Sequence, residues 1–301
     1  MSTAADEQAW LDALREVLDT TVRLVLPCYQ VDRLDPAPGS QAAAELHSTE
    51  RNAEDQPWGE RPVRTALVAA KMSCLIAASQ AQAISQLLRA SPSSSPVEVL
   101  SRAVIEAAIQ ALWLLEPRLG ARRRVARLQA LRLASAVEAR RTAVALGTGQ
   151  EPSGYSETED KVRAYSKYLG IAEPVLERVK GRRGPVAVCE GEAVPGYTER
   201  AKVLLDLFDD ASAYNLYAGV AHGELYALWR AFRPSGAVVG GQPWYGLESD
   251  LRLLHAAVGG VRGALIAPAL ASLGLFGWGP GELGTWCERS DDQMARLDPA
   301  T

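Results

Sequence analysis

Helical periodicity is the feature that most constrains how this chain folds. Alanine, leucine, arginine and glutamate recur at helical spacing, whereas runs of β-branched and aromatic residues with alternating polarity do not recur. Hydrophobic residues make up 48% of the 301 positions and the formal net charge is −4, which is a globular and not a disordered composition. The sequence therefore predicts an all-α protein built as a helical bundle.

Proline, glycine and serine clusters divide the chain into predicted helices and loops. Helices are expected over 4–26, 61–90, 96–116, 119–146, 157–169, 198–233 and 249–274. Ser95 is expected to cap the third of these helices, which begins at Pro96. Loops are expected over 31–60, 181–197 and 234–248, and the tail from Gly279 is expected to be polar with one possible helical turn.

The predicted elements group into three ranges of what we expect to be one domain. Residues 1–94 supply N-terminal helices and a loop packed on the bundle, residues 95–233 form the helical core, and residues 234–301 add a C-terminal helix and a tail. No internal repeat with a period of 20–50 residues is present, which argues against a solenoid.

Cysteine, histidine and hydropathy patterns bear on cofactors and location. The four cysteines are too scattered for a disulfide framework or a C-x-x-C site, and the three histidines are isolated, so we predict no metal, no cofactor and a reducing compartment. The most apolar stretch, 263–278, is shorter than the roughly 20 residues of a membrane span and contains Pro268. We expect a buried core helix there, no membrane association and a cytoplasmic location.

Polar residues interrupt the apolar surface of the predicted helix 96–116 along one face. Arg102, Glu106, Gln110 and Trp113 lie at i, i+4, i+8 and i+11. The rest of this helix is apolar nearly all round and therefore predicted to be buried, so Arg102 and Glu106 must be paired, and their spacing allows them to pair with each other. Such a pair serves either a functional site or the packing register of the bundle.

A second polar face is predicted on the helix that contains residues 214–224. Asn215, Gly219, His222, Tyr226 and Trp229 align along it. Gly219 and Gly223 carry no side chain, which allows a ligand or another helix to approach His222 closely. His222 can act as a proton shuttle because its ordinary pKa is near neutrality, and it can equally be a core histidine bonded to a tyrosine.

The segments SRAVIEAAIQALWLLEP (101–117) and YNLYAGVAHGELYAL (214–228) together resemble an uncharacterised bacterial branch of the HEPN (higher eukaryotes and prokaryotes nucleotide-binding) superfamily. That branch pairs an R-x-x-x-E helix with a later Y-x-x-x-S-x-x-x-H-G helix, and the resemblance covers roughly residues 95–232. It implies a four-helix bundle that often dimerises, and in many members a metal-independent ribonuclease of a toxin or phage-defence system. The arginine that the superfamily's nuclease motif places four to six positions before the histidine is not matched, because Asn215, Leu216 and Tyr217 stand there.

Our first hypothesis is therefore a HEPN-like protein, expected to be a homodimer, that acts on or binds RNA or a nucleotide. His222 would be the general base or a ligand contact, Arg102 would stabilise phosphate charge, and Glu106 would orient one of them. The residues expected to contact substrate are Tyr214, Asn215, Tyr217, Tyr226, Trp113 and Gln110.

Two alternatives stay open, and so does the question of whether the chain is an enzyme. One is a small-molecule enzyme of secondary metabolism, with a cyclase-type reaction in a cavity lined by aromatic residues that include Trp113 and Tyr226. The other is a non-catalytic dimeric scaffold whose polar cluster is structural. Residues 118–141 add eight arginines against one acid, Glu138, which indicates either a phosphate-binding strip or a solvated helix face.

Overall fold

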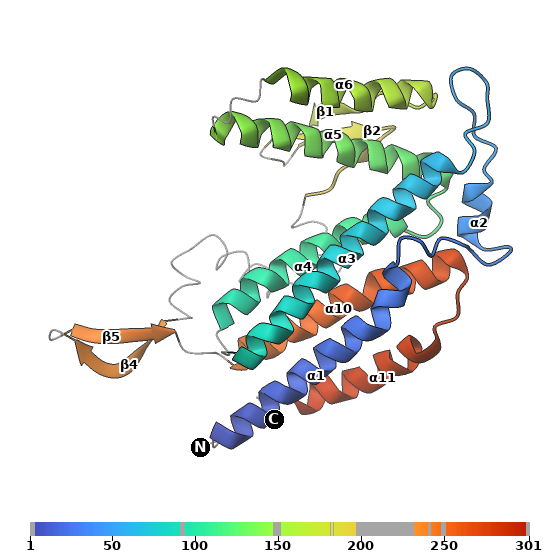
Figure 1. Cartoon of the computed structure of the whole chain (residues 1–301). Coiled ribbons are helices and arrows are strands. Elements are labelled where there is room, and N and C mark those ends of the chain that lie inside the picture. Colours follow the sequence, from blue (N-terminus) through green and yellow to red (C-terminus); the bar gives the residue numbers. More distant parts are fainter. Residues whose placement is uncertain are drawn as a thin grey trace.

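The computed structural model describes residues 4–90, 94–146, 152–180, 182, 184–196, 232–239, 242–247 and 251–298. Its helices are α1 (Ala4–Tyr29), α2 (Gln41–Leu46), α3 (Arg61–Ala90), α4 (Ser94–Leu115), α5 (Ala121–Leu146), α6 (Pro152–Tyr168), α10 (Leu251–Phe276) and α11 (Gly281–Arg296). Its strands are β1 (Val175–Arg178), β2 (Pro185–Cys189), β3 (Glu192–Ala193), β4 (Phe232–Val239) and β5 (Gln242–Leu247). The predicted all-helical class is confirmed (Figure 1).

Four long helices close into a bundle. Helix α3 packs against α4, α4 against α10, α10 against α1, and α1 against α3, so that each helix has two neighbours (Figure 1). Helix α11 covers the outside of α1, and α2 packs against α3 and α10. Helices from all three predicted ranges, 1–94, 95–233 and 234–301, therefore form the bundle. Two of its four helices, α1 and α3, come from the first range.

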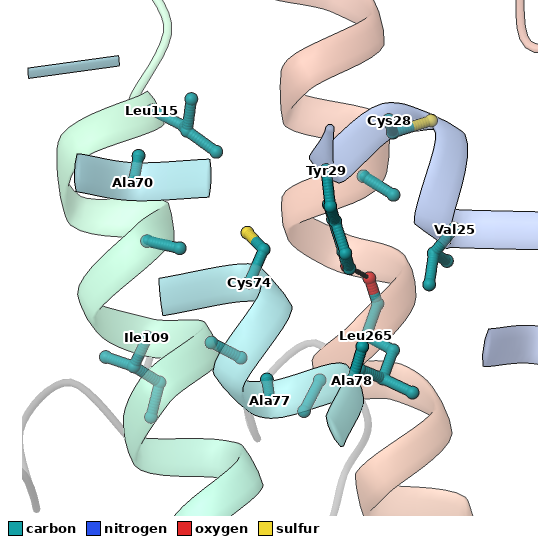
Figure 2. Packing of buried hydrophobic residues seen from close by; sticks show 14 of the residues in the cluster. Val25, Cys28, Tyr29, Ala70, Cys74, Ala77, Ala78, Ile109, Leu115 and Leu265 are labelled. Carbon is teal, nitrogen blue, oxygen red and sulfur yellow. Dashed lines mark hydrogen bonds between the residues drawn. The ribbon is translucent and has the colours of Figure 1, made fainter. Parts of the chain in front are cut away.

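The bundle core consists of aliphatic and small side chains at helical spacing. Leu14, Leu67, Ile105 and Leu265 are fully buried and come one from each of the four helices. Figure 2 shows small residues of α3, such as Ala77, packed between the larger side chains of its neighbours. Burial of such a continuous apolar stripe is what stabilises an amphipathic helix in a bundle.

A second layer lies beside one end of the bundle, formed by α5, α6 and a three-stranded antiparallel sheet of order β1-β2-β3 (Figure 1). Helix α5 packs on both α6 and β2. The N-terminal half of α5, with Val125 and Leu128, joins the apolar core of the bundle. A separate apolar cluster of this layer is small and contains Leu133, Val137, Val162 and Ala187.

The prediction of a loop over 181–197 is wrong, because β2 and β3 form a hairpin there. Cys189 and Glu192 are register partners, and the two residues between them, Glu190 and Gly191, have φ angles of 50° and 78°. Two successive residues with positive φ make the tight turn that matches the twist of a hairpin. The glycine predicted to be part of a loop is therefore a turn residue between strands.

Three further predictions of irregular structure are wrong. The 234–248 loop contains the β4–β5 hairpin, whose first strand begins at Phe232, inside the helix predicted over 198–233. The 31–60 loop contains α2, whose first turn is capped by the Ser40 hydroxyl accepting from the Ala43 amide. The tail forms the 16-residue α11, because Leu283, Trp286, Ser290 and Met294 recur at helical spacing and are buried.

By length and composition, α3 and α10 are apolar enough to cross a membrane. Half of the most apolar window of α3 and 72% of that of α10 are buried inside the protein. Core helices of globular proteins share these properties, so the observation is weak support for a membrane span. The predicted cytoplasmic location stays a prediction.

Candidate functional site

The predicted Arg102–Glu106 ion pair is present on α4. The Arg102 Nε donates to Glu106 Oε1 at 2.7 Å, and the two side chains are 19% and 22% exposed. The i, i+4 spacing on one helix is the cause, because it places the guanidinium one turn from the carboxylate. Partial burial strengthens the pair relative to a surface ion pair, since less water screens it.

Gln110 and Trp113 follow on the same helix but connect α4 to other elements. The Gln110 amide donates to the Ser73 hydroxyl of α3 at 3.1 Å. The Trp113 ring lies under the guanidinium of Arg127 from α5, with 5.0 Å between the Arg127 Cζ and the ring centroid. These two residues therefore tie α4 to α3 and α5 instead of extending the ion pair.

Five predicted site residues lie outside the described residues. They are Tyr214, Asn215, Tyr217, His222 and Tyr226. Their meeting with Arg102 and Glu106 stays a prediction.

The N-terminal half of α5 contains a set of buried arginine–glutamate pairs that the sequence analysis missed. Arg124 is fully buried, and its Nε and Nη2 donate to the two oxygens of Glu45 at 2.6 and 2.8 Å. Arg127 is 5% exposed and donates to Glu192 at 2.7 Å. Two-pronged contacts between a guanidinium and a carboxylate are strong and directional.

The outer arginines of the same helical turns are paired as well. Arg122 bonds Glu190 and the carbonyl of Gly170, and Arg123 bonds Glu192. Burial acts to raise the pKa of Glu192, but the hydrogen bonds from Arg127 and Arg123 outweigh it, so the pKa of this carboxyl lies below its ordinary range. The predicted solvated face is wrong at Arg124 and Arg127, which are buried, whereas the paired Arg122 and Arg123 side chains are 38% and 56% exposed. The predicted phosphate-binding strip stays a prediction.

Two cavities flank α5. One, of about 1110 Å³, lies between α5 and the β1–β2 strands, and the other, of about 720 Å³, lies among α3, α4, α5 and α6. Gln110, Leu131, Ser135 and Ala139 line both, so the two cavities adjoin. Among the described lining residues, Tyr165 is the one aromatic, and Trp113 is not included. The aromatic lining expected for a cyclase-type site is therefore not formed by this part of the chain.

Lys71 of α3 is a fully buried cation inside the bundle. Its Nζ donates to the carbonyls of Gln30 and Arg33 at 3.1 and 2.6 Å, just beyond the C-terminal end of α1. The ring centroids of Phe276 and Trp278 lie 4.9 and 4.8 Å from it. Burial lowers the pKa of Lys71 to about 8, since no carboxylate in the described part of the chain forms an ion pair with it.

The described residues contain no cluster of three or more His, Cys, Asp or Glu side chains that could hold a metal ion. His47 lies exposed at the end of α2, and the ring of His255 hydrogen-bonds the Met294 carbonyl at 2.8 Å. No family model, curated protein or solved structure matches this chain.

Proposed function

We propose that this chain binds or acts on a nucleotide or a short RNA segment at a polar cluster centred on the Arg102–Glu106 pair. The observation that carries the proposal is this pair, held at 2.7 Å on a helix of the bundle. In the proposed chemistry, Arg102 stabilises phosphate charge, Glu106 orients its guanidinium, and His222 is the general base. The resemblance of the two segments to HEPN proteins supports the same assignment.

The neutralised arginines of α5 limit the substrate class. Affinity for a long nucleic acid depends on many unpaired cations that contact successive phosphates. Arg122, Arg124 and Arg127 are each engaged by a carboxylate. Because these α5 arginines are already neutralised, we expect the protein to bind a compact ligand with one or a few phosphates better than a long duplex.

Induced expression tests the proposal. We expect the wild-type chain to slow growth of a bacterial host and to change its RNA profile, and His222→Ala and Arg102→Gln to abolish both effects. Arg15→Gln is the matched control, because Arg15 is an arginine paired i, i+3 with Asp12 on the outside of α1. Thermal unfolding of each purified variant checks that it is folded.

An unchanged RNA profile on expression of the wild-type chain, together with growth that matches His222→Ala, would overturn the proposal. In that case Arg102→Gln is expected to lower Tm and to change nothing else, as for a structural ion pair in a scaffold. Light scattering of the purified chain tests the homodimer that the resemblance implies.

A further inference from the structure

The smaller cavity beside α5 has the size and the walls of a small-molecule site. Its volume of about 720 Å³ falls within the ~300–1,000 Å³ that is typical of ligand pockets. Val68 of α3, Leu128 of α5 and Val162 of α6 are among the apolar residues of its wall. It is separate from Arg102, which lies about 12 Å along α4 from the nearest lining residue, Gln110.

One buried polar side chain in this wall has no partner. Gln129 is 1% exposed, and neither its amide nitrogen nor its amide oxygen makes a hydrogen bond in the described part of the chain. Leaving a buried donor and acceptor unpaired destabilises a fold, and side chains this deeply buried are paired in the great majority of cases. Both amide atoms are closed off from the cavity as the side chain stands, so a ligand that supplies one acceptor and one donor satisfies Gln129 when this side chain turns into the cavity.

One cation in the same wall also has no ion-pair partner within the described ranges. Arg132 is half-buried and, unlike the other buried and half-buried arginines of α5, forms no ion pair with a described residue. It lies three residues after Gln129, so the two side chains are neighbours on the helix surface. Burial lowers the pKa of Arg132, but a guanidinium stays protonated at neutral pH.

The charged side chains in the described part of the cavity wall are all positive. Lys161 is its other ionisable group, apart from the Tyr165 phenol, and the Lys161 Nζ lies 2.7 Å from a Glu157 oxygen in a highly exposed pair. No acidic residue is among the described lining residues. An apolar cavity with one unpaired guanidinium fits a ligand with an apolar body and one negative charge.

We propose that this cavity binds an amphipathic carboxylate with an N–H group next to its head, the chemistry of an N-acyl amino acid. The carboxylate accepts from Arg132 and from the Gln129 amide nitrogen, the ligand N–H donates to the Gln129 amide oxygen, and the acyl chain lies against Leu128 and Val162. This cavity shares Gln110 with the residues predicted to contact the nucleotide, but the inference rests on Gln129 and Arg132, which are not part of the proposed nucleotide site.

Calorimetry on the full chain tests the head group. The probe is N-dodecanoylglycine, used below its micelle concentration, with its methyl ester and dodecanoate as comparisons. We expect the acid to bind about tenfold or more tightly than the ester, because the ester loses the charge-assisted hydrogen bonds. Dodecanoate, which lacks the N–H donor, is expected to fall between them. Absence of binding by the acid, or equal affinities of acid and ester, overturns the proposal.

Variants test the residues. Arg132→Gln is expected to reduce the affinity for N-dodecanoylglycine about tenfold while leaving that for the ester unchanged. Gln129→Leu is expected to raise the Tm of the free protein and yet to weaken binding of the acid, two effects that a purely structural glutamine would not combine. Arg89→Gln, at an exposed arginine of α3, is the matched control. If Arg132→Gln and Arg89→Gln bind N-dodecanoylglycine with equal affinity, the assignment of Arg132 as a contact of the carboxylate is overturned.

Discussion

The buried lysine of the bundle and the buried arginines of the α5 layer are held in different ways. In the bundle, the Lys71 ammonium is surrounded by two backbone carbonyls and two aromatic rings. In the α5 layer, Arg124 and Arg127 are buried against the carboxylates of Glu45 and Glu192. The first arrangement solvates a cation with dipoles and ring faces, and the second neutralises it.

The difference follows from the chemistry of the two kinds of cation. The bundle has an apolar core shared by four long helices, which tolerates a single buried ammonium at the end of α1. The N-terminal half of α5 shares that core, and beyond it the α5 layer has a separate four-residue apolar cluster. The directional ion pairs of Arg124 and Arg127 fix where α5 meets α2 and the β3 strand. Lys71 loses proton affinity on burial, whereas a guanidinium keeps its charge and needs the carboxylate.

Breaking the Arg124–Glu45 pair is expected to have the largest effect. Arg124→Met leaves the Glu45 carboxylate buried without its cation, which costs about 3–5 kcal/mol of the free energy of unfolding. Urea unfolding measures this loss. The double variant Arg124→Met/Glu45→Leu is expected to regain most of it, because no buried charge is left. A single variant that loses under 1 kcal/mol would show that the pair does not hold the layer in place.

An intermediate effect is expected from Lys71 as the pH changes. The pKa of Lys71 is about 8 in the folded chain and near 10.5 when unfolded, so between these values the unfolded state binds more protons and stability increases with pH. Relative to Lys71→Met, the wild-type chain should gain on the order of 3 kcal/mol from pH 7 to pH 10.5.

Buried thiols change the free energy of unfolding with pH in the direction opposite to Lys71. The wild type must therefore be compared with Lys71→Met at each pH. Burial raises the pKa of Cys28 and Cys74, so the unfolded chain ionises first and stability decreases at high pH. Both proteins carry these cysteines, so the difference between their denaturation curves reports the loss of the Lys71 ammonium together with its smaller effect on the two thiols, whose pKa values its charge lowers. Parallel curves for wild type and Lys71→Met would contradict the buried, unpaired ammonium.

The smallest effect is expected where α5 is exposed. Arg141 lies 3.5 Å from Glu138, and the side chains are 59% and 71% exposed. Arg141→Gln should change the free energy of unfolding by less than about 0.5 kcal/mol, because water screens the pair. The urea titration used for Arg124→Met also measures this change. A loss as large as that of Arg124→Met would refute the distinction between buried ion pairs in the N-terminal half of α5 and exposed ones in its C-terminal half.

Local sequence patterns predicted the long helices because a helix is stabilised mainly by residues three and four positions apart. Helix α3 has the bounds predicted for it, and the Arg102–Glu106 pair follows from i, i+4 spacing on α4. The same reasoning missed α11, where a polar composition concealed four buried residues, and the β2–β3 hairpin, where strands of five and two residues are too short to show a period.

The sequence by itself determined the helical class and the pairing of residues one turn apart, because both depend on contacts within a single helix. Only the tertiary structure decided which arginines of α5 are neutralised, since Glu45 and Glu192 are 79 and 65 positions away from their partners along the chain. It also decided that Gln129 and Arg132 have no hydrogen-bonding or ion-pair partner among the described residues of a cavity wall, because burial there is produced by α3, α4 and α6 together. Such contacts depend on packing between distant segments, which no local period encodes.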